Sequence, residues 1–324
     1  MSKSIRIHQH GGPEILRWED TPTPAPAAGE ALIRQDAIGV NFIDVYYRTG
    51  MYKLPSFPAV LGMEGAGIVE AVGDKVTGVA PGDRVAYSSS MGSYASRRVI
   101  AADRLVKLPD SVDTVTAAGM MLRGLTVQAL LRQVRPLQPG ETILVHAAAG
   151  GVGLLLCQWA RHIGADVIGV VSTEKKAEVA RQNGATHTII GLTDLAAQVK
   201  RLTGGAMVPV VYDSVGAESF IASLDSLAPR GLMVSYGNSS GEVTGVNLSL
   251  LAVRGSLYVT RPTLMSYVAK RDALESAAAE LFDVVASGAL KVQIGQQFPL
   301  SRAADAHRAL ESRATIGSTV LIPD

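Results

Sequence analysis

The sequence predicts an α/β protein with two domains, one rich in short strands and one built on a parallel sheet. Its 324 residues are enough for two domains, and 47% of them are hydrophobic. The first third of the chain holds short apolar–polar runs separated by glycine and proline, which is typical of β-structure. After about residue 141, apolar strands alternate with helices, and this order indicates βαβ units.

The first domain is predicted from strands that alternate in polarity and end at turn residues. A proline-rich connector, TPTPAPAAGE, separates the first strand from the others. Short strands at this spacing favour a compact barrel-like arrangement. The predicted strands are SIRIHQH (4–10), EALIRQDAIGV (30–40), GAGIVEAVG (65–73) and DRVAYSS (83–89).

The second domain is predicted from strands and helices in strict alternation. Near-continuous apolar strands fit a sheet that is covered on both faces. After Arg261-Pro262 the chain returns to a helix and then to short β segments, the last of which is expected to rejoin the first domain. We therefore assign residues 1–123 and 267–324 to a discontinuous outer domain, and residues 124–266 to an inserted α/β domain. The predicted strands of this second domain are ETILVHA (141–147), ADVIGVV (165–171), HTII (187–190), VPVVYDSV (208–215) and GLMVSYG (231–237).

Composition argues against several functional classes. The single cysteine, Cys157, cannot form an internal disulfide or a multi-cysteine zinc site, and its apolar helix indicates a core position. The formal net charge is +1 and no basic run is interleaved with aromatic residues, so nucleic acid is not an expected partner. No apolar leader or span is evident, so we expect no membrane association and predict a cytoplasmic protein.

The stretch ILVHAAAGGVG (143–153) has the features of a phosphate-binding turn. An apolar strand runs into small residues and glycines, and a helix and a second strand follow. Glycine at positions 150 and 151 lets the backbone approach an anion, and Gly153 lets the helix pack close to the strand. Ala148 stands where the first glycine of G-x-G-x-x-G is expected, but the strand–turn–helix context still predicts a dinucleotide site.

The end of the next strand predicts that this dinucleotide is NADPH. An NAD site usually places Asp or Glu about 20 residues beyond the glycines, where it binds the ribose 2′-hydroxyl. This sequence has Ser172 there and Lys176 just beyond, and a hydroxyl and an ammonium bind a 2′-phosphate through charge-assisted hydrogen bonds. Glu174 is interpreted as a first-turn helix residue. The alternative for Lys175 and Lys176 is a solvated helix start.

Together these residues make the chain resemble the medium-chain dehydrogenase/reductase superfamily, and within it the zeta-crystallin-like NADPH:quinone oxidoreductases, especially their bacterial members. The resemblance covers essentially the whole chain. It implies a Rossmann-type doubly wound parallel sheet domain, a GroES-like β-barrel catalytic domain, NADPH as cofactor and a homodimer. The stretches that carry it include HGGPEIL, AIGVNFIDVYYRTG, GMEGAGIVEAVG, HAAAGGVG, VVYDSVG, GLMVSYGNSSG and LESRATIGSTVLIP.

The resemblance also implies roles for particular residues. Asn41 and Tyr46 would lie beside the nicotinamide and its ribose, and Thr126 near the nicotinamide end. Ser172 and Lys176 would hold the adenosine 2′-phosphate. The further cofactor contacts that it implies are Gly150, Gly151 and Val152 in the glycine turn, Tyr236, Gly237, Asn238 and Ser239 in a loop that crosses the cofactor, and Arg313 late in the chain.

Two positions depart from patterns found in the superfamily. Zinc alcohol dehydrogenases carry Gly-His-Glu near the start of the outer domain, whereas this chain has Gly62-Met63-Glu64, and a thioether does not replace an imidazole as a zinc ligand. We therefore expect no zinc, a structural role for Glu64, and a hydride acceptor that needs no Lewis acid. The second departure is Gly191, where bacterial relatives often have a tyrosine that covers the adenine, so the adenine contact is left open.

The chemistry is expected to reside in the cofactor, which the protein orients, because no nucleophile–base set or carboxylate pair stands out. Tyr46, Tyr47 and Tyr52 cluster beside the expected cleft, where one could hydrogen-bond a quinone oxygen or donate a proton. Tyr46 and Tyr52 are therefore candidate catalytic residues, with passive lining of the cleft as the alternative, and the resemblance adds Asn41 to them. Arg123 either faces the cleft or is solvated, and it is not counted as catalytic.

The predicted function is reduction of a quinone by hydride delivery from NADPH, in a metal-free cleft between the two domains. One alternative keeps the cofactor and changes the acceptor to an α,β-unsaturated aldehyde or ketone. The other is a nucleotide-dependent RNA-binding protein, against which the near-neutral charge weighs. The apolar segment GSLYVTR (255–261) is expected to form an edge strand that pairs with a second copy of the chain.

Overall fold

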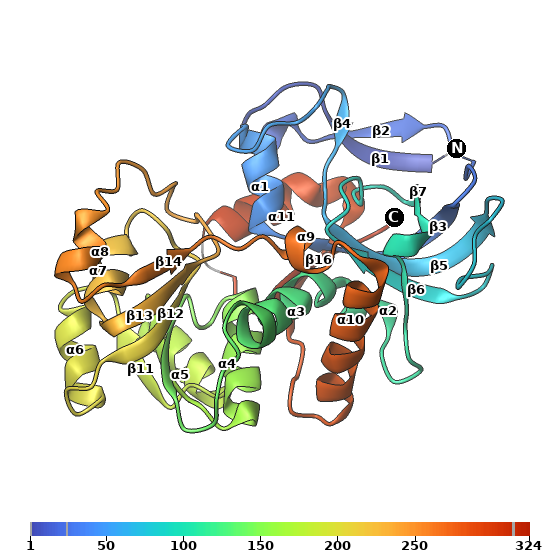
Figure 1. The fold of residues 1–324 in the computed structure, drawn as a ribbon. Coiled ribbons are helices and arrows are strands. Elements are labelled where there is room, and N and C mark those ends of the chain that lie inside the picture. Colours follow the sequence, from blue (N-terminus) through green and yellow to red (C-terminus); the bar gives the residue numbers. More distant parts are fainter. Residues whose placement is uncertain (1, 24, 313–314) are drawn as a thin grey trace. The chain divides into compact units, whose positions relative to one another are not determined.

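The structure, a computed structural model, describes residues 2–23, 25–312 and 315–324 and separates into two compact units (Figure 1). Unit 1 consists of Met1–Leu125, Val268–Ala286 and Val292–Asp324, and unit 2 of Thr126–Tyr267 and Ser287–Lys291. The short segment 287–291 therefore lies with unit 2, whereas the sequence analysis assigned it to the outer domain. The Gln158 side chain contributes to this placement, because it accepts the N–H of Lys291 at 2.7 Å and donates to its carbonyl oxygen at 3.2 Å.

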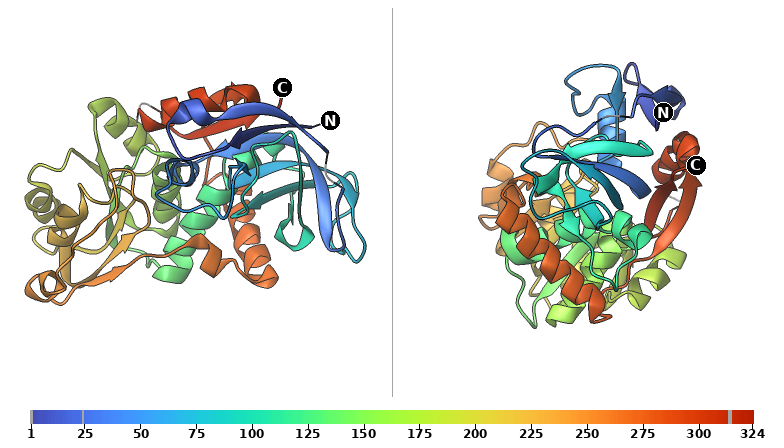
Figure 2. Two further views of the ribbon diagram at one scale, coloured as in Figure 1. Left: turned by 90° about the horizontal axis from the view of Figure 1, so that it is seen from above. Right: turned by 90° about the vertical axis from the view of Figure 1, so that its right-hand side faces the viewer.

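A seven-stranded sheet runs through unit 1 in the order β15-β16-β3-β5-β6-β8, with β7 also paired to β3. The strand β3 (Glu30–Val40) pairs antiparallel with β5 (Glu64–Val72), β7 (Arg97–Ala101) and β16 (Ser318–Ile322). The last strand of the chain, in red, thus lies beside an early one, in blue (Figure 2). The other strands are β6 (Arg84–Ser88), β8 (Val106–Lys107) and β15 (Ile294–Pro299), and a separate three-stranded sheet contains β2 (Arg17–Thr21), β1 (Ser2–Ile7) and β4 (Ala59–Val60).

The strand β3 contributes to two hydrophobic clusters because the alternation of its side chains between the two faces of the sheet is interrupted. Ile33 packs in one cluster with Val69 and Val85, and Ile38 packs in another with Leu61. The pairing of β3 with β5 shifts register between Leu32 and Ile33 and again between Gln35 and Ala37. A bulge of this kind bends a strand and re-aims the side chains beyond it, so one strand can serve both cores.

Helices of unit 1 are placed beside the ends of these strands. The helix α1 (Phe42–Thr49) begins two residues after β3 ends, and Asn41 caps it. The helix α2 (Thr114–Ala118) is capped by Asp113, whose carboxylate accepts the N–H of Thr116 at 2.8 Å. The other helices described in this unit are α10 (Arg271–Ala286) and α11 (Ala303–Glu311). Short 3-10 turns lie at Pro13–Ile15, Ala102–Arg104 and Leu300–Arg302. The boundary between the two units falls inside α3 (Met121–Gln128).

Unit 2 is built on a six-stranded parallel sheet in the order β11-β10-β9-β12-β13-β14. Numbered within the unit, this order is 3-2-1-4-5-6, which defines the doubly wound Rossmann arrangement and confirms the predicted fold class. The direction of winding reverses between β9 and β12, where ligands bind in such sheets. The strands are β9 (Thr142–His146), β10 (Asp166–Val171), β11 (His187–Ile190), β12 (Val208–Asp213), β13 (Leu227–Ser235) and β14 (Tyr258–Thr260).

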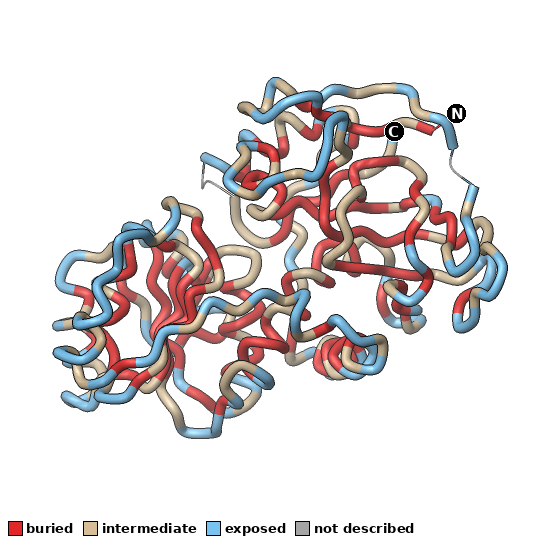
Figure 3. The backbone as a smooth tube through the Cα atoms, turned by 45° about the horizontal axis from the view of Figure 1, so that its top comes forward, coloured by how far each residue is buried: buried red, intermediate tan, exposed pale blue. Residues whose placement is uncertain are grey.

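The parallel sheet forms the core of unit 2. Central strand residues such as Leu144, Ile168 and Val211 are fully buried, and the strands stand out in red in Figure 3. The predicted core cysteine, Cys157, is buried in α4 (Gly151–Ile163). The other helices are α5 (Glu174–Gln182), α6 (Leu195–Leu202), α7 (Phe220–Asp225), α8 (Ser249–Val253) and α9 (Leu264–Tyr267), with a π-helical turn at Ala129–Val134. None of the helices in the described part of the chain has the length and apolar character needed to cross a bilayer.

Candidate functional site

The glycine turn lies at the carboxyl end of β9, beside the point where the sheet reverses its winding. Gly150 caps α4 in an extended conformation, and its N–H donates to the carbonyl oxygen of Ala147 at 2.8 Å. A Cβ atom added at Gly153 would lie 2.2 Å from that same oxygen, so glycine is needed for the helix to approach the strand. Gly150, Gly151 and Val152 thus lie at the N-terminus of α4, where amides without intrahelical partners and the helix dipole favour an anion.

The second strand of the unit, β10, ends next to an exposed hydroxyl and not a carboxylate. Ser172 follows β10 directly and is exposed, and Thr173 caps α5 by accepting the N–H of Lys176 at 3.3 Å. Glu174 lies in the first turn of α5, as predicted, and its carboxylate binds the guanidinium of Arg181 at 2.7 Å. This acid is thus engaged by an arginine on its own helix.

A loop after β13 packs against the loop after β12. The N–H of Tyr236 donates to the carbonyl oxygen of Asp213 at 2.7 Å, and that of Ser239 to Ser214 at 3.2 Å. A Cβ atom at Gly237 would lie 2.4 Å from the Ser214 oxygen, which explains the glycine. The predicted loop contacts Tyr236, Gly237, Asn238 and Ser239 therefore lie at the same edge of the sheet as the glycine turn, because parallel strands deliver their carboxyl ends to one edge.

Thr126, Gly191 and Arg313 are the other positions that the sequence analysis linked to the cofactor. Thr126 lies in α3. Gly191 follows β11 in the left-handed region, with φ of 76°, and its N–H donates to Val171 at 2.8 Å. The space where a Gly191 side chain would project is open. Arg313 lies outside the described residues.

In unit 1, the predicted residues Asn41, Tyr46 and Tyr52 come together around α1. The Asn41 N–H donates to the Asp44 carboxylate at 2.9 Å, which closes a capping box at the start of the helix. The rings of Tyr46 and Tyr52 meet edge to face with centroids 5.3 Å apart, and Tyr52 donates its N–H to the Tyr46 carbonyl oxygen at 3.0 Å. Tyr47 packs against Tyr52 from another side, with centroids 5.6 Å apart, and burial raises the pKa of its phenol.

A buried ion pair orients the side chain of Asn41. The Asn41 amide donates to Glu64 at 2.7 Å, and the Arg123 guanidinium lies 3.3 Å from the same carboxylate oxygen. Arg123 also donates to the carbonyl oxygens of Gly119 and Val40, at 3.0 and 2.5 Å. Burial raises the pKa of the Glu64 carboxyl against the opposing effect of Arg123. The reading of Arg123 as a solvated residue was wrong, because its partners are all inside the protein.

The residues at positions 62–64 do not fit a zinc site. Met63 is buried and offers a thioether, and Glu64 is fully buried and occupied by Arg123. Within residues 2–23, 25–312 and 315–324, no group of three or more His, Cys, Asp or Glu side chains is placed to hold a metal ion. Zinc sites in proteins need three or four nitrogen, sulfur or oxygen ligands around one point.

A second buried network extends from Asp44 and was not predicted. The Tyr94 hydroxyl lies 3.0 Å from Asp44 and 2.9 Å from Nε2 of His307, and Arg48 donates to Nδ1 of His307 at 2.9 Å. Because Nδ1 accepts, His307 is neutral and donates from Nε2 to Tyr94, which donates to Asp44. Burial, together with Arg48, lowers the pKa of His307 to about 3. Arg48 is neutralised by a bidentate pair with Glu311, at 2.7 and 2.8 Å.

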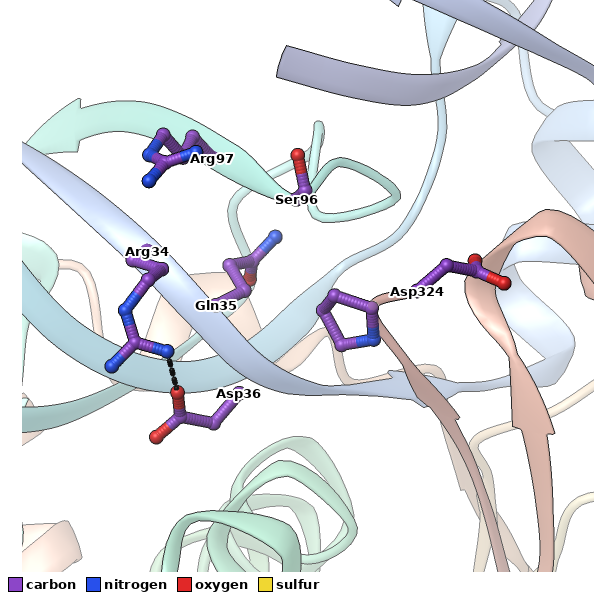
Figure 4. Close-up of a pocket in the computed structure, with 7 residues that line it drawn as sticks. Arg34, Gln35, Asp36, Ser96, Arg97 and Asp324 are labelled. Carbon is purple, nitrogen blue, oxygen red and sulfur yellow. Dashed lines mark hydrogen bonds and ion pairs between the residues drawn. The ribbon is translucent and has the colours of Figure 1, made fainter. Parts of the chain in front are cut away.

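Elsewhere on unit 1, a polar cavity of about 320 Å³ is lined by residues of β3, the start of β7 and the last two residues of the chain (Figure 4). Its charged groups are already paired: Arg34 binds Asp36 at 2.7 Å, and Arg97 binds Glu70 at 2.7 Å. The Asp324 carboxylate accepts the hydroxyl of Ser301 at 2.8 Å. We therefore do not assign a ligand to this cavity, whose lining residues are Arg34, Gln35, Asp36, Ser96, Arg97, Pro323 and Asp324.

A doubly wound nucleotide-type sheet joined to a strand-rich unit defines the class of two-domain dehydrogenases and reductases. Comparisons with known proteins agree, because residues 27–110 match the family model for the alcohol dehydrogenase GroES-like domain and residues 151–282 match that for zinc-binding dehydrogenases. The chain is 52% identical to a quinone oxidoreductase of Pseudomonas aeruginosa over the full length of both proteins. It therefore belongs to the quinone oxidoreductase family of the medium-chain dehydrogenase/reductase superfamily, as the sequence predicted.

Two further relatives bear on activity. The crystal structure of an Escherichia coli quinone oxidoreductase complexed with NADPH superposes with a TM-score of 0.97 at 49% identity, covering 99% of this chain and all of that one. A 2-haloacrylate reductase of a Burkholderia species is 44% identical, over 98% of both chains. The family thus contains proteins named for quinones and one named for a halogenated alkene acid.

The buried acid at the start of α1 predicts a pH dependence of stability. Burial is the main cause that raises the pKa of Asp44 from 3.8 to about 7. The folded protein then holds a proton between these values that the unfolded chain releases, so stability falls as pH rises from about 4 to about 7, by up to about 1.4 kcal/mol per pH unit. Asp44→Asn, which mimics the protonated acid, should flatten this part of the curve in urea denaturation series.

The matched control is Asp83→Asn, because the pKa of Asp83 is shifted the other way. Its hydrogen bond with Lys107 and the N–H of Ala80 lower that pKa, so the stability it contributes is lost only as pH falls below the ordinary range of the acid. Asp83→Asn should therefore leave the slope between pH 4 and 7 intact. Parallel curves for wild type and Asp44→Asn in that window would refute the assignment.

Proposed function

We propose that the protein is an NADPH-dependent reductase that delivers a hydride to quinones. The observation that carries the proposal is the glycine turn at the carboxyl end of β9, at the reversal point of a doubly wound sheet, followed on the next strand by Ser172 in place of an acid. NADPH, when bound, supplies the hydride. The E. coli relative, whose crystal structure is a complex with NADPH, supports the same cofactor.

In this proposal, unit 2 binds the dinucleotide through its backbone and two polar side chains. Gly150, Gly151 and Val152 present helix-start amides to the pyrophosphate. Ser172 and Lys176 bind the 2′-phosphate, and the Glu174 carboxylate is engaged by Arg181. The other contacts proposed for this unit are Thr126, Tyr236, Gly237, Asn238 and Ser239.

Unit 1 is proposed to act at the nicotinamide and the acceptor. Asn41 is held by Glu64 and Asp44, so its orientation is fixed before the cofactor arrives. Tyr46 and Tyr52 carry phenol groups that can donate a hydrogen bond to an acceptor oxygen or pass it a proton. Their edge-to-face contact restrains both rings, which suits residues that orient a flat substrate.

The acceptor is proposed to be a molecule that takes hydride without a Lewis acid. Gly62-Met63-Glu64 replaces the zinc-ligating pattern of the alcohol dehydrogenases, and a quinone or an electron-poor alkene needs no metal to polarise it. The 2-haloacrylate reductase relative favours an α,β-unsaturated acceptor as the second candidate. A third candidate, nucleotide-dependent RNA binding, has only the resemblance behind it, and the formal charge of +1 weighs against it. A cytoplasmic location stays a prediction.

The choice of acceptor is tested by NADPH oxidation with a panel of quinones against a panel of 2-alkenals, enones and 2-haloacrylates. We expect the highest kcat/KM values with quinones. Faster turnover with the alkenes would move the protein to the alkene-reductase class and keep the cofactor proposal. Tight NADPH binding with no turnover in either panel would contradict the enzymatic proposal and direct attention to binding functions.

Cofactor selectivity is tested at the start of α5. Lys176→Ala should raise the Kd for NADPH at least about tenfold, the expected loss for a charge-assisted hydrogen bond, and leave the Kd for NADH unchanged. Lys175→Ala is the matched control, because it removes the same charge from the neighbouring position, which is more exposed. Equal effects of the two variants would contradict a specific hydrogen bond from Lys176 and leave only its positive charge as a contribution. Tighter binding of NADH than of NADPH by the wild type would overturn the cofactor proposal.

We further propose a homodimer formed through β14. This strand is the last in its sheet and pairs only with β13 within the described chain, and it exposes Tyr258 and Val259, which are 61% and 39% accessible. The N–H and C=O groups along such an edge can pair with another strand. In a dimer with two-fold symmetry, β14 of the second copy provides that strand. Other exposed apolar side chains in the same part of the sequence are Val246, Leu248, Val253 and Met265.

The dimer is tested by placing a charge on this edge. Val259→Lys should convert the protein from twice the 33.9 kDa chain mass to a monomer in sedimentation velocity at micromolar concentration. The control is Ile190→Lys, because Ile190 is similarly exposed on β11, the opposite edge of the same sheet. A monomeric wild type, or loss of the dimer in the Ile190 variant alone, would contradict the use of β14.

A further inference from the structure

A buried polar network joins the carboxyl ends of two strands of unit 2, next to the candidate cofactor site. His146 ends β9, Asp213 ends β12, and Ser219 and Ser223 lie at the start of α7 and within it. All four side chains are at most 1% accessible. The strands β9 and β12 are neighbours in the sheet and flank the point where its winding reverses.

Asp213 is the centre of this network because both of its carboxylate oxygens act as acceptors. Oδ1 accepts the N–H groups of Val215 and Gly216, at 2.7 and 3.1 Å. Oδ2 accepts the hydroxyls of Ser219 and Ser223, at 2.6 and 2.7 Å. A buried carboxylate is costly without such donors, so this set fixes the Asp213 side chain in one orientation.

The same hydrogen bonds fix the tautomer of His146. Its Nε2 atom lies 2.9 Å from Oγ of Ser223, and the single hydroxyl proton of Ser223 is already directed to Asp213. Nε2 must therefore carry the proton and donate it to Ser223. Burial lowers the pKa of His146, which keeps the ring neutral.

The network reaches both backbone segments that are proposed to hold the cofactor. His146 is followed directly by Ala147, the first residue of the glycine turn, whose φ is 50°. Asp213 holds the N–H groups of residues 215 and 216, and the carbonyl oxygens of residues 213–215 in turn accept the N–H groups of Tyr236, Ser239 and Ser240, at 2.7, 3.2 and 2.8 Å. A chain of hydrogen bonds thus runs from His146, which directly precedes the glycine turn, to the loop 236–240.

We propose that Asp213 and Ser223 are positioning residues, which set the phosphate-binding turn and the loop 236–240 in register for NADPH without touching it. The proposal rests on the assignment of NADPH as cofactor. A purely structural role for these residues predicts lower stability of unit 2 and unchanged affinity. A positioning role predicts weaker NADPH binding under conditions where the variant is fully folded.

The central test compares two serine variants of α7 and its C-terminal cap. Ser223→Ala removes one donor to Asp213 and the acceptor of His146. Ser226→Ala is the control, because Ser226 is equally buried but gives its hydroxyl to the carbonyl oxygen of Ala222, at 2.7 Å. We expect Ser223→Ala to raise the Kd for NADPH at least about fivefold, and Ser226→Ala to leave it within about twofold of wild type.

A second measurement tests the directions of these hydrogen bonds in the absence of the cofactor. In Asp213→Asn, the amide oxygen can keep the two N–H groups while its NH₂ group faces the serine hydroxyls, which frees the Ser223 proton for donation to His146. The His146 ring should then change from the Nε2–H to the Nδ1–H tautomer, which ¹⁵N NMR of the imidazole distinguishes. A wild-type His146 ring that carries its proton on Nδ1 would contradict the hydrogen-bond directions on which the proposal depends.

The outcomes separate the two proposals. A wild type that does not bind NADPH refutes the proposed cofactor, and this inference with it. A wild type that binds NADPH, with Ser223→Ala and Ser226→Ala indistinguishable in affinity, overturns the positioning role alone. If Asp213→Asn fails to fold, the two serine variants still decide the question.

Discussion

The candidate cofactor site depends on the parallel pairing of β9 with β10 on one side and β12 on the other. Parallel strands bring their carboxyl ends to one edge of a sheet, and the reversal of winding beside β9 opens a crevice there. The glycine turn and the loops after β10, β12 and β13 consequently meet at that edge, although they are spread over about 90 residues of sequence. The buried residues of β9, Ile143, Leu144 and Val145, hold this strand in the centre of the unit.

Buried carboxylates fix the backbone around the candidate site residues in both units. Glu64 accepts the Asn41 amide and the N–H of Leu122, and Asp213 accepts N–H groups of its own loop. Hydrogen bonds to a charged acceptor are stronger than neutral ones, and a buried acid that loses its donors is heavily penalised. These acids therefore restrict the local geometry to few alternatives. Asn41 is held directly by such an acid, and the loop 236–240 is held through the backbone that Asp213 fixes.

Local patterns in the sequence were enough to predict the fold class, the glycine turn and the edge strand. Each of these depends on residues close together in the chain, such as the apolar run before Gly150 or the segment that ends at β14. The networks of Asp44 with His307 and of His146 with Ser223 were not predicted, because their members are 263 and 77 residues apart, respectively, and a single histidine carries no local signal of its partner. The asparagine and aspartate of NFID were the one local sign, since that spacing suits a capping box. Arg123 was ambiguous for the same reason, because its partner Glu64 lies on a distant strand.

The residues around Glu64 explain why a chain matched by a model for zinc-binding dehydrogenases has a different chemistry at positions 62–64. That model covers residues 151–282, most of which belong to unit 2, whereas the ligand pattern belongs to unit 1. In unit 1, the positive charge beside the Glu64 carboxylate is the guanidinium of Arg123, which also binds two backbone carbonyl oxygens. A guanidinium in this position satisfies the buried acid and repels a second cation. In the proposed reaction, polarisation of the acceptor is therefore assigned to hydrogen-bond donors, and the phenols of Tyr46 and Tyr52 are the donors proposed for this role.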